Sequence, residues 1–364
     1  MKAVLTLFAV ACALLASAAP RGFMRGADVS SLAQVEASGG RFFDLDGRPA
    51  DLFKILKRHG FNWIRLRVWT QPKGKLVDDG VLELARRAKK EGFKLLVDFH
   101  YSDSWADPGK QRCPAVWEGL SAEEKVAAIE DYTRRAIAKF ASGGARPDAV
   151  QLGNETNNGF VWPDGKIWGG GSEKAGGMEG FVALLKAAAK GARAAGKDMK
   201  TIVHLAEGGD NAKCRAVLDP LAAAGVDFDM IGLSFYPYWH GKTAGLKANM
   251  EDLAKRFGKP VAVVETSYAW TKGHGDAKTN VFPVDGNEAS VEIQRSKVRE
   301  VVDAVRAVEG GAGVFYWEPA WLPSDREGSP WENQALFDFK GRALPGIGIW
   351  CETVPKGTVE KAGQ

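Results

Sequence analysis

The chain has 364 residues, of which 45% are hydrophobic, 26% charged and 10% aromatic. These proportions are typical of a globular protein and exclude a collagen-like repeat or a chain that is disordered throughout. The net charge is +4, and the 49 Lys and Arg residues are scattered along the sequence. A nucleic-acid-binding protein usually concentrates its basic residues in one patch, so we expect no nucleic-acid partner.

Residues 1–18 have the organisation of a secretory signal peptide. Lys2 supplies a positive start, residues 3–15 form an apolar run, and Ala16-Ser17-Ala18 is a small-residue cleavage site. The run is shorter than the roughly 20 residues of a transmembrane helix. We therefore expect a secreted protein, extracellular or periplasmic, with no membrane contact after cleavage. A disordered or membrane-anchored N-terminus is the alternative.

The remaining residues, 19–364, are expected to form one catalytic domain and to act as a monomer. After removal of Cys12 with the signal, three cysteines remain: Cys113, Cys214 and Cys351. One disulfide and one free thiol are possible in an oxidising compartment, but the sequence does not select the pair. The cysteine spacings do not resemble a zinc site, and no metal or other cofactor is predicted.

Short apolar segments alternate with amphipathic ones from residue 24 onward. Strands are predicted at 24–29, 62–68, 94–99, 149–152, 201–205, 230–235, 261–264 and 313–316. Helices are predicted at 51–59, 81–91, 122–141, 180–195, 212–224, 246–257 and 289–308. This alternation predicts an α/β fold, a single-domain (β/α)8 TIM barrel. The alternative is a doubly wound sheet, but the glycine-rich phosphate loop typical of that fold is missing.

Polar and aromatic residues recur where the predicted strands end. In a (β/α)8 barrel the chemistry lies at the C-terminal ends of the strands. Glu155 follows the fourth strand and Glu265 follows the seventh, so the two carboxylates are expected to face each other across one cleft. Two carboxylates that flank one bond are the requirement of glycoside hydrolysis, in which one acts as the acid and the other as the nucleophile.

Six longer stretches resemble one family of enzymes. They are 25–30 (RGADVS), 65–69 (RLRVW), 98–111 (DFHYSDSWADPGKQ), 151–159 (QLGNETNNG), 234–239 (SFYPYW) and 316–321 (YWEPAW). Asn154-Glu155 and Val264-Glu265 are similar to the catalytic segments of the clan A retaining (β/α)8 glycosidases. Within that clan the longer stretches resemble the arabinogalactan endo-β-1,4-galactanases, glycoside hydrolase family 53. The similarity extends from about Gly26 to residues 333–345.

This resemblance implies roles for individual residues. Glu155 corresponds to the general acid/base and Glu265 to the nucleophile. Asn154 would hold the sugar 2-hydroxyl, and Tyr236 would orient the nucleophile. The other substrate-binding residues that it implies are Arg67 and His100 near Glu265, Trp317 as a platform beneath the sugar, and Asp28, Trp105 and Trp321.

Several other polar residues also lie near the strand ends. Arg65 is either part of the site or part of a polar layer inside the barrel. His204 is expected to be a hydrogen-bonded core histidine, and Glu318 is not expected to be the nucleophile. Asp98 and Asp103 would orient other groups. Some bacterial relatives bind calcium in the seventh and eighth loops, but residues 273–278 hold one carboxylate, so no calcium is predicted.

The sequence therefore predicts a secreted endo-β-1,4-galactanase that hydrolyses (arabino)galactan with retention of configuration and needs no cofactor. One alternative is another clan A endo-β-1,4-glycanase, namely a mannanase, xylanase or glucanase. A second is a non-catalytic carbohydrate-binding barrel, which the presence of both carboxylates disfavours. A metal-dependent hydrolase is also disfavoured, because five histidines in no H-x-H or H-E-x-x-H arrangement give it little support.

Overall fold

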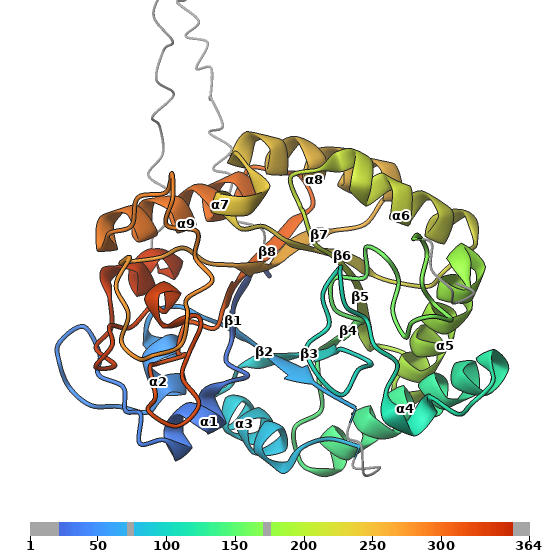
Figure 1. Cartoon of the computed structure of the whole chain (residues 1–364), viewed down its shortest axis with the longest axis horizontal. Helices are drawn as coiled ribbons and strands as arrows, with labels where there is room; N and C mark the ends of the chain where they lie inside the picture. The colour runs from blue at the N-terminus through green and yellow to red at the C-terminus, as the bar shows by residue number, and fades with distance from the viewer. Residues whose placement is uncertain (1–21, 71–75, 170–175, 352–364) are drawn as a thin grey trace, which may run out of the picture.

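The protein is a closed barrel of eight parallel strands surrounded by helices (Figure 1). The computed structural model describes residues 22–70, 76–169 and 176–351. The predicted signal peptide and its cleavage site lie outside these residues. Each strand pairs with the next, and β8 closes the barrel against β1. The strands are β1 (Met24–Asp28), β2 (Trp63–Val68), β3 (Lys94–Phe99), β4 (Ala149–Leu152), β5 (Lys200–Leu205), β6 (Met230–Ser234), β7 (Val261–Thr266) and β8 (Gly311–Trp317).

The helices form a ring outside the strands (Figure 1). They are α1 (Leu32–Ala37), α2 (Leu52–Arg58), α3 (Asp79–Lys90), α4 (Ala122–Ser142), α5 (Gly177–Ala195), α6 (Asn211–Ala223), α7 (Pro237–His240), α8 (Thr243–Phe257) and α9 (Val291–Arg306). Three 3-10 turns, η1 (Ala115–Trp117), η2 (Glu332–Gln334) and η3 (Pro345–Trp350), lie in the connections. The predicted (β/α)8 fold is confirmed, while the short helices α1 and α7 were not anticipated.

Side chains inside the barrel are stacked in layers, because alternate residues of a strand point to the same side. The lower layer is apolar and includes Trp63, Leu96, Ile202 and Phe315. Two residues further along β2, β3, β4 and β5 come the polar side chains Arg65, Asp98, Gln151 and His204, all buried. Because each polar residue is two positions after an apolar one on the same strand, the polar side chains form a second layer, nearer the C-terminal end of the barrel.

A register shift on β7 places one carboxylate in this layer. The pairing of β7 with β8 shifts between Val263 and Thr266, and the pairing of β6 with β7 shifts so that Ser234 lies opposite Glu265. Such a bulge changes the direction in which a side chain points. Val264 belongs to the apolar cluster inside the barrel, and the shift allows the adjacent Glu265 to reach the polar layer as well.

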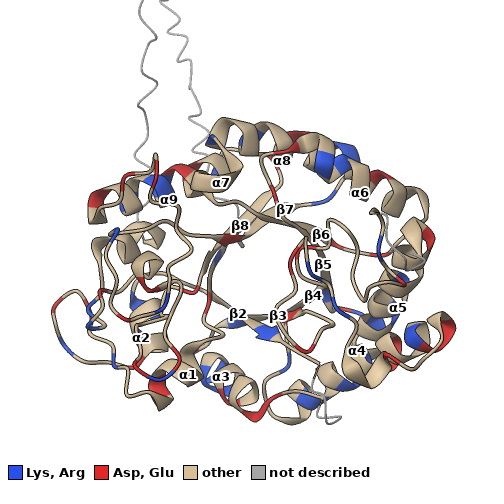
Figure 2. Cartoon of the chain, viewed as in Figure 1, with Lys and Arg blue, Asp and Glu red and all other residues tan. Residues whose placement is uncertain are grey.

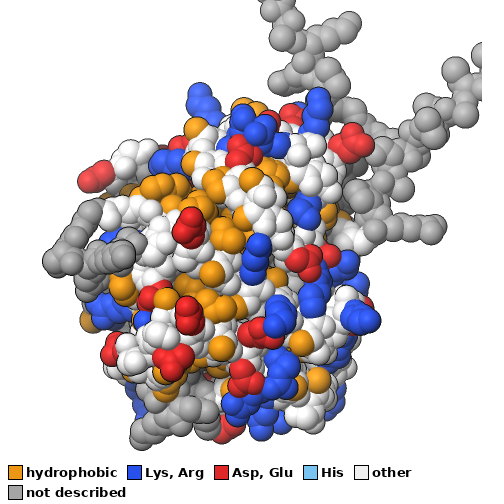
Figure 3. Space-filling model, turned by 90° about the vertical axis from the view of Figure 1, so that its right-hand side faces the viewer, with side chains coloured by type: hydrophobic (Ala, Val, Ile, Leu, Met, Phe, Trp, Pro, Cys, Tyr) orange, Lys and Arg blue, Asp and Glu red, His pale blue; other side chains and the backbone are white. Residues whose placement is uncertain are grey.

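Charged residues lie along the outer helices and at the strand ends (Figure 2). On the face shown in Figure 3, basic and acidic side chains are interspersed with apolar ones. Within the described residues, no helix is long and apolar enough to cross a membrane. The three described cysteines are free: Cys214 is buried, Cys113 is half-buried and Cys351 is exposed.

Candidate active site

A cleft of about 380 Å³ opens at the C-terminal end of the barrel. Glu155 and Glu265 both line it, as expected for residues that follow strands on opposite sides of the barrel. Its walls are largely aromatic, and they comprise Trp105, Tyr236, Trp239, Trp317, Trp321 and Trp331. Indole and phenol faces beside a pair of carboxylates are typical of a site that binds sugar rings, whose C–H faces pack on aromatic rings.

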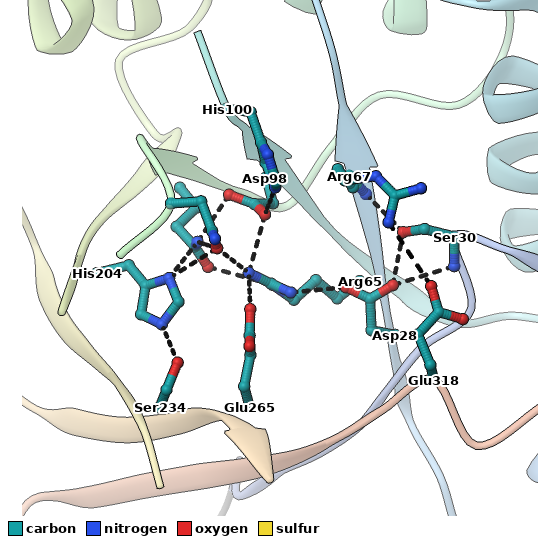
Figure 4. A network of polar contacts seen from close by, with 12 residues as sticks. Asp28, Ser30, Arg65, Arg67, Asp98, His100, His204, Ser234, Glu265 and Glu318 are labelled. Carbon is teal, nitrogen blue, oxygen red and sulfur yellow. Dashed lines mark hydrogen bonds and ion pairs between the residues drawn. The ribbon is translucent and has the colours of Figure 1, made fainter. Parts of the chain in front are cut away.

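Arg65 on β2 is the centre of the polar layer beneath the cleft (Figure 4). Its guanidinium lies 2.6 Å from Asp28, 2.9 Å from Asp98 and 2.9 Å from Glu265. It also donates to the side-chain oxygens of Asn154 at 2.9 Å and Gln151 at 3.2 Å. The residue is 1% exposed. A single buried cation thus faces three carboxylates, and their charges raise its pKa despite burial.

Arg67, also on β2, lines the same cleft as Glu265, as expected, but it is not the cation in contact with that carboxylate. Of the two arginines, Arg65 rather than Arg67 contacts Glu265. The Arg67 guanidinium lies 3.9 Å from the ring centre of Trp105 and 4.4 Å from that of Trp69. Its nearest carboxylate is Glu318, at 3.8 Å. Arg65 rather than Arg67 is beside Glu265 because residues two apart on a strand share a side of the sheet but not a height in the barrel, and Arg67 is the outer of the two.

Glu265 lies between one cation and one hydroxyl group. Its Oε1 is 2.9 Å from Arg65, and its Oε2 accepts a hydrogen bond from the Tyr236 hydroxyl at 2.9 Å. Burial raises the pKa of Glu265 to about 7, against the opposing effects of Arg65 and Tyr236. These two partners both favour the ionised form, as a nucleophilic carboxylate requires.

Glu155 directly follows Gly153-Asn154 at the end of β4, with a backbone φ of +47°. Burial and the charge of Glu265 raise the pKa of Glu155 to about 8. No basic side chain among the described residues forms an ion pair with it. Glu155 therefore keeps its proton more readily than Glu265, and this difference between two nearby carboxyls separates an acid from a nucleophile.

Asn154 and His100 border the two carboxylates on the cleft floor. The Asn154 side chain donates to the Ala106 carbonyl at 2.9 Å while accepting from Arg65, so its orientation is fixed. His100 Nε2 lies 3.1 Å from Asp98, and Nδ1 accepts from the Ala106 backbone N–H at 3.2 Å. Burial lowers the pKa of His100, so the ring is neutral and donates to Asp98.

Most of the predicted substrate-binding residues line the cleft, namely Arg67, His100, Trp105, Asn154, Tyr236, Trp317 and Trp321. Asp28 is the exception: it is 1% exposed beneath Arg65, and it also accepts the Ser30 backbone N–H at 3.0 Å. Covered in this way, Asp28 cannot reach a substrate in the cleft. Its expected binding role is therefore corrected to that of a counter-charge for Arg65.

Two other acidic residues are also accounted for by local contacts. Glu318 is 0% exposed and accepts hydrogen bonds from both the backbone and the side chain of Ser31, so it points away from the cleft. Asp103 accepts the backbone N–H of Ala115 at 2.8 Å and belongs to a loop turn.

Trp331 and Lys110 line the cleft and were not predicted. Trp331 meets Trp317 edge to face, with ring centres 4.5 Å apart and an interplanar angle of 81°. It comes from the long loop after β8, whose path could not be read from the sequence. Its position after Pro330 was the one available signal, since tryptophans beside turn residues often lie on loops that face a ligand.

In the loop after β7, the side chain of Asp276 accepts backbone N–H groups of Lys278, Ser324 and Ser329. These bonds fasten that loop to the loop after β8. Among the residues that the structure describes, no group of three or more His, Cys, Asp or Glu side chains is arranged to hold a metal ion.

The fold and the site together define a (β/α)8 barrel with the carboxylate pair of a glycoside hydrolase. The sequence model of "Glycosyl hydrolase family 53" matches residues 24–350, and the chain belongs to this family. The chain is 33% identical over 382 residues to an endo-beta-1,4-galactanase of Bacillus subtilis (strain 168), a match that covers 91% of this chain and 86% of that protein.

Solved structures of the same family have the same fold. The GH53 catalytic domain of Ignisphaera aggregans superposes with a TM-score of 0.83 at 40% identity, covering 91% of this chain and 96% of that one. A fungal beta-1,4-galactanase superposes with a TM-score of 0.78 at 31% identity, covering 90% and 98%.

Proposed function

We propose that this protein is a secreted endo-β-1,4-galactanase that cleaves internal bonds of galactan or arabinogalactan with net retention of configuration. The main observation behind this proposal is that Glu155 and Glu265 line one aromatic-walled cleft but differ in the charges and hydrogen bonds around them. Membership of family 53 and the names of its relatives support β-1,4-galactan as the substrate.

In the first step, protonated Glu155 donates its proton to the glycosidic oxygen while the Glu265 carboxylate attacks the anomeric carbon. The glycosidic C–O bond breaks, and a covalent galactosyl ester forms on Glu265. In the second step, Glu155, now ionised, takes a proton from a water molecule whose oxygen attacks the same carbon. The ester bond to Glu265 breaks, and the product keeps its original configuration.

The surrounding residues support both steps. Arg65 and Tyr236 stabilise the ionised form of Glu265, which also suits it as a leaving group in the second step. Asn154 would hold the sugar 2-hydroxyl, a contact that strengthens as positive charge develops at the anomeric carbon. Trp317 would lie beneath the sugar at the cleavage point, while Trp105 and Trp321, stacked with ring centres 6.1 Å apart, would extend the aromatic surface.

The test is the release of reducing ends from debranched galactan by wild type, Glu155→Ala and Glu265→Ala, with mannan, xylan and cellulose as comparison substrates. Only galactan should be cut, and both variants should lose most activity. Azide should rescue Glu265→Ala with an activated galactoside and yield the inverted α-galactosyl azide. Cleavage of another glycan instead would overturn the substrate assignment, and activity in both variants would overturn the site.

The proposal includes export and a monomeric mature protein. Mass spectrometry of the protein recovered from the medium or the periplasm should place its N-terminus after residue 18, and sedimentation should give the mass of one chain. Comparison of branched with debranched galactan would show whether arabinose side chains are accepted.

A further inference from the structure

His204 lies near the end of β5, 0% exposed beneath the cleft floor, where it accepts hydrogen bonds from the two successive backbone N–H groups on either side of the Glu155 Cα. The Glu155 backbone N–H donates to His204 Nδ1 at 3.2 Å, and the Thr156 backbone N–H donates to the His204 carbonyl at 2.9 Å. Glu155 occupies the left-handed region, which is sparsely populated by residues other than glycine. His204 therefore supports the backbone where it is strained.

The surroundings of the ring define its protonation state. Gln151 accepts from Arg65 Nε through Oε1 at 3.2 Å, so its Nε2 is the atom that lies 2.8 Å from His204 Nδ1. Two N–H groups thus point at Nδ1. The Asn154 Oδ1, 3.0 Å from the same nitrogen, takes its own hydrogen bond from Arg65. Burial and the charge of Arg65 lower the pKa of His204, so the ring is neutral with its proton on Nε2.

The proton on Nε2 has one clear acceptor. His204 Nε2 lies 2.9 Å from Ser234 Oγ, and Ser234 is 0% exposed on the neighbouring strand β6 (Figure 4). Because this oxygen accepts from the histidine, its own O–H is available to donate. Hydrogen bonding with the Ser234 side chain lowers the pKa of Glu155 against the effect of burial.

We propose that His204 and Ser234 are positioning residues for Glu155, the last links of a directed hydrogen-bond chain that runs from Arg65 through Gln151 to the Glu155 carboxyl. The inference deepens the proposed function and rests on it, since it concerns the acid/base of the same reaction. Arg65 also contacts Glu265, so the chain joins both carboxylates to one guanidinium. Donation from Ser234 favours the ionised form of Glu155, which is the form that activates water in the second step.

Three variants test this hydrogen-bond chain. Ser234→Ala removes the final donor. His204→Asn keeps an acceptor near the Glu155 backbone and loses the Nε2–H, whereas His204→Gln retains a donor near the Nε2 position. Thr133→Val removes a buried hydroxyl in α4, away from the cleft, and is the matched control.

On galactan, Ser234→Ala and His204→Asn should lower kcat about tenfold with KM within about twofold. The alkaline limb of kcat/KM should move up by about half a pH unit or more, because the pKa of Glu155 rises without its donor. On dinitrophenyl β-1,4-galactobioside, whose leaving group needs no proton, kcat/KM should stay within about twofold. His204→Gln should restore part of the loss, and Thr133→Val should match the wild type.

Two measurements need no substrate. A ¹⁵N spectrum of the wild type should show His204 neutral with its proton on Nε2, and ¹³C titration of Glu155 should move upward in Ser234→Ala. If the wild type does not cut galactan but the Glu155 titration moves in Ser234→Ala, the proposed function is wrong while the hydrogen-bond chain is supported. The hydrogen-bond chain would be overturned if the wild type cuts galactan but Ser234→Ala and His204→Asn leave both the alkaline limb and the Glu155 titration unchanged. A proton on His204 Nδ1 would overturn it as well.

Discussion

The Arg65 guanidinium and the Glu265 carboxylate lie 2.9 Å apart, and both are buried at the floor of the cleft. This ion pair is not isolated, because Asp28 and Asp98 contact the same guanidinium. The charge of Glu265, the proposed nucleophile, is thus set by one cation and two further carboxylates. Both the stability of the barrel and the ionisation of Glu265 depend on the one positive charge.

Replacing Arg65 with Met should destabilise the protein strongly, since it leaves buried carboxylates without a counter-charge. Removal of one partner from a buried ion pair typically costs about 3–5 kcal/mol. Urea denaturation of wild type and Arg65→Met at pH 6 measures the difference in the free energy of unfolding. Arg86→Met is the control, because that arginine is half exposed and should cost little. Equal stabilities of the two variants would contradict the central role of Arg65.

Tyr236→Phe should raise the pKa of Glu265, because the tyrosine hydroxyl donates to its Oε2 and favours the ionised form. As the proposed nucleophile, Glu265 must be ionised, so the acidic limb of kcat/KM should move to higher pH. We expect kcat to fall by about 10- to 100-fold, as for loss of a hydrogen bond to a charged group. The pH profile on galactan measures both effects. Tyr268→Phe, whose hydroxyl donates to the Glu288 carbonyl, should keep the wild-type profile.

The fold could be predicted because its signal is local and repeated. Alternation of strand and helix patterns, with Glu155 and Glu265 at two strand ends, placed both carboxylates correctly at one end of the barrel. The site could not be completed in this way, because height within the barrel depends on shear between strands and on the bulge in β7. This is why Arg67 was placed beside Glu265 where the structure has Arg65.

Hydrogen-bond partners on neighbouring strands were equally hidden. His204 and Gln151 are 53 residues apart in sequence, and the register in which β4 pairs with β5 brings their side chains together in the polar layer. Trp331 was missed because it follows an irregular loop, which carries no periodic pattern. What the sequence lacked was therefore information on three-dimensional register rather than on residue chemistry.

Glu155→Gln should make the protein more stable than the wild type at pH 8. Burial raises the pKa of Glu155 to about 8 in the folded protein, while an unfolded glutamate titrates near 4.3. Between these values the unfolded chain releases a proton that the folded chain retains, so wild-type stability falls as pH rises. The glutamine does not titrate. Thermal denaturation from pH 5 to pH 8 should show a difference in Tm that grows with pH, and a constant difference would contradict the raised pKa.

Glu265→Gln should lower the pKa of Glu155, because the charge of Glu265 contributes to raising it. The substitution keeps the size of the side chain and removes one negative charge from the cleft. Titration of the ¹³C-labelled Glu155 carboxyl in wild type and variant measures the change. Glu83→Gln, at a half-exposed position on α3, is the control and should leave this titration in place. A Glu155 titration unaltered by Glu265→Gln would show that the two carboxyls do not interact.

Trp331→Ala should weaken galactan binding more than it slows the chemical steps. The Trp331 indole packs edge to face on Trp317, and its ring centre lies 5.7 Å from that of Tyr236. Removal of the indole therefore leaves Trp317, the proposed sugar platform, without a packing partner on one side. An aromatic pair contributes about 0.5–1.5 kcal/mol beyond its buried area, which corresponds to a 2- to 10-fold rise in KM. Trp168→Ala removes an exposed indole outside the cleft and should leave KM unchanged.

Initial rates on galactan oligosaccharides of increasing length separate the effects of Trp331→Ala on binding and on catalysis. A rise in KM with kcat nearly preserved supports a binding role. A loss confined to kcat would instead assign Trp331 to holding Trp317 and Tyr236 in position for catalysis.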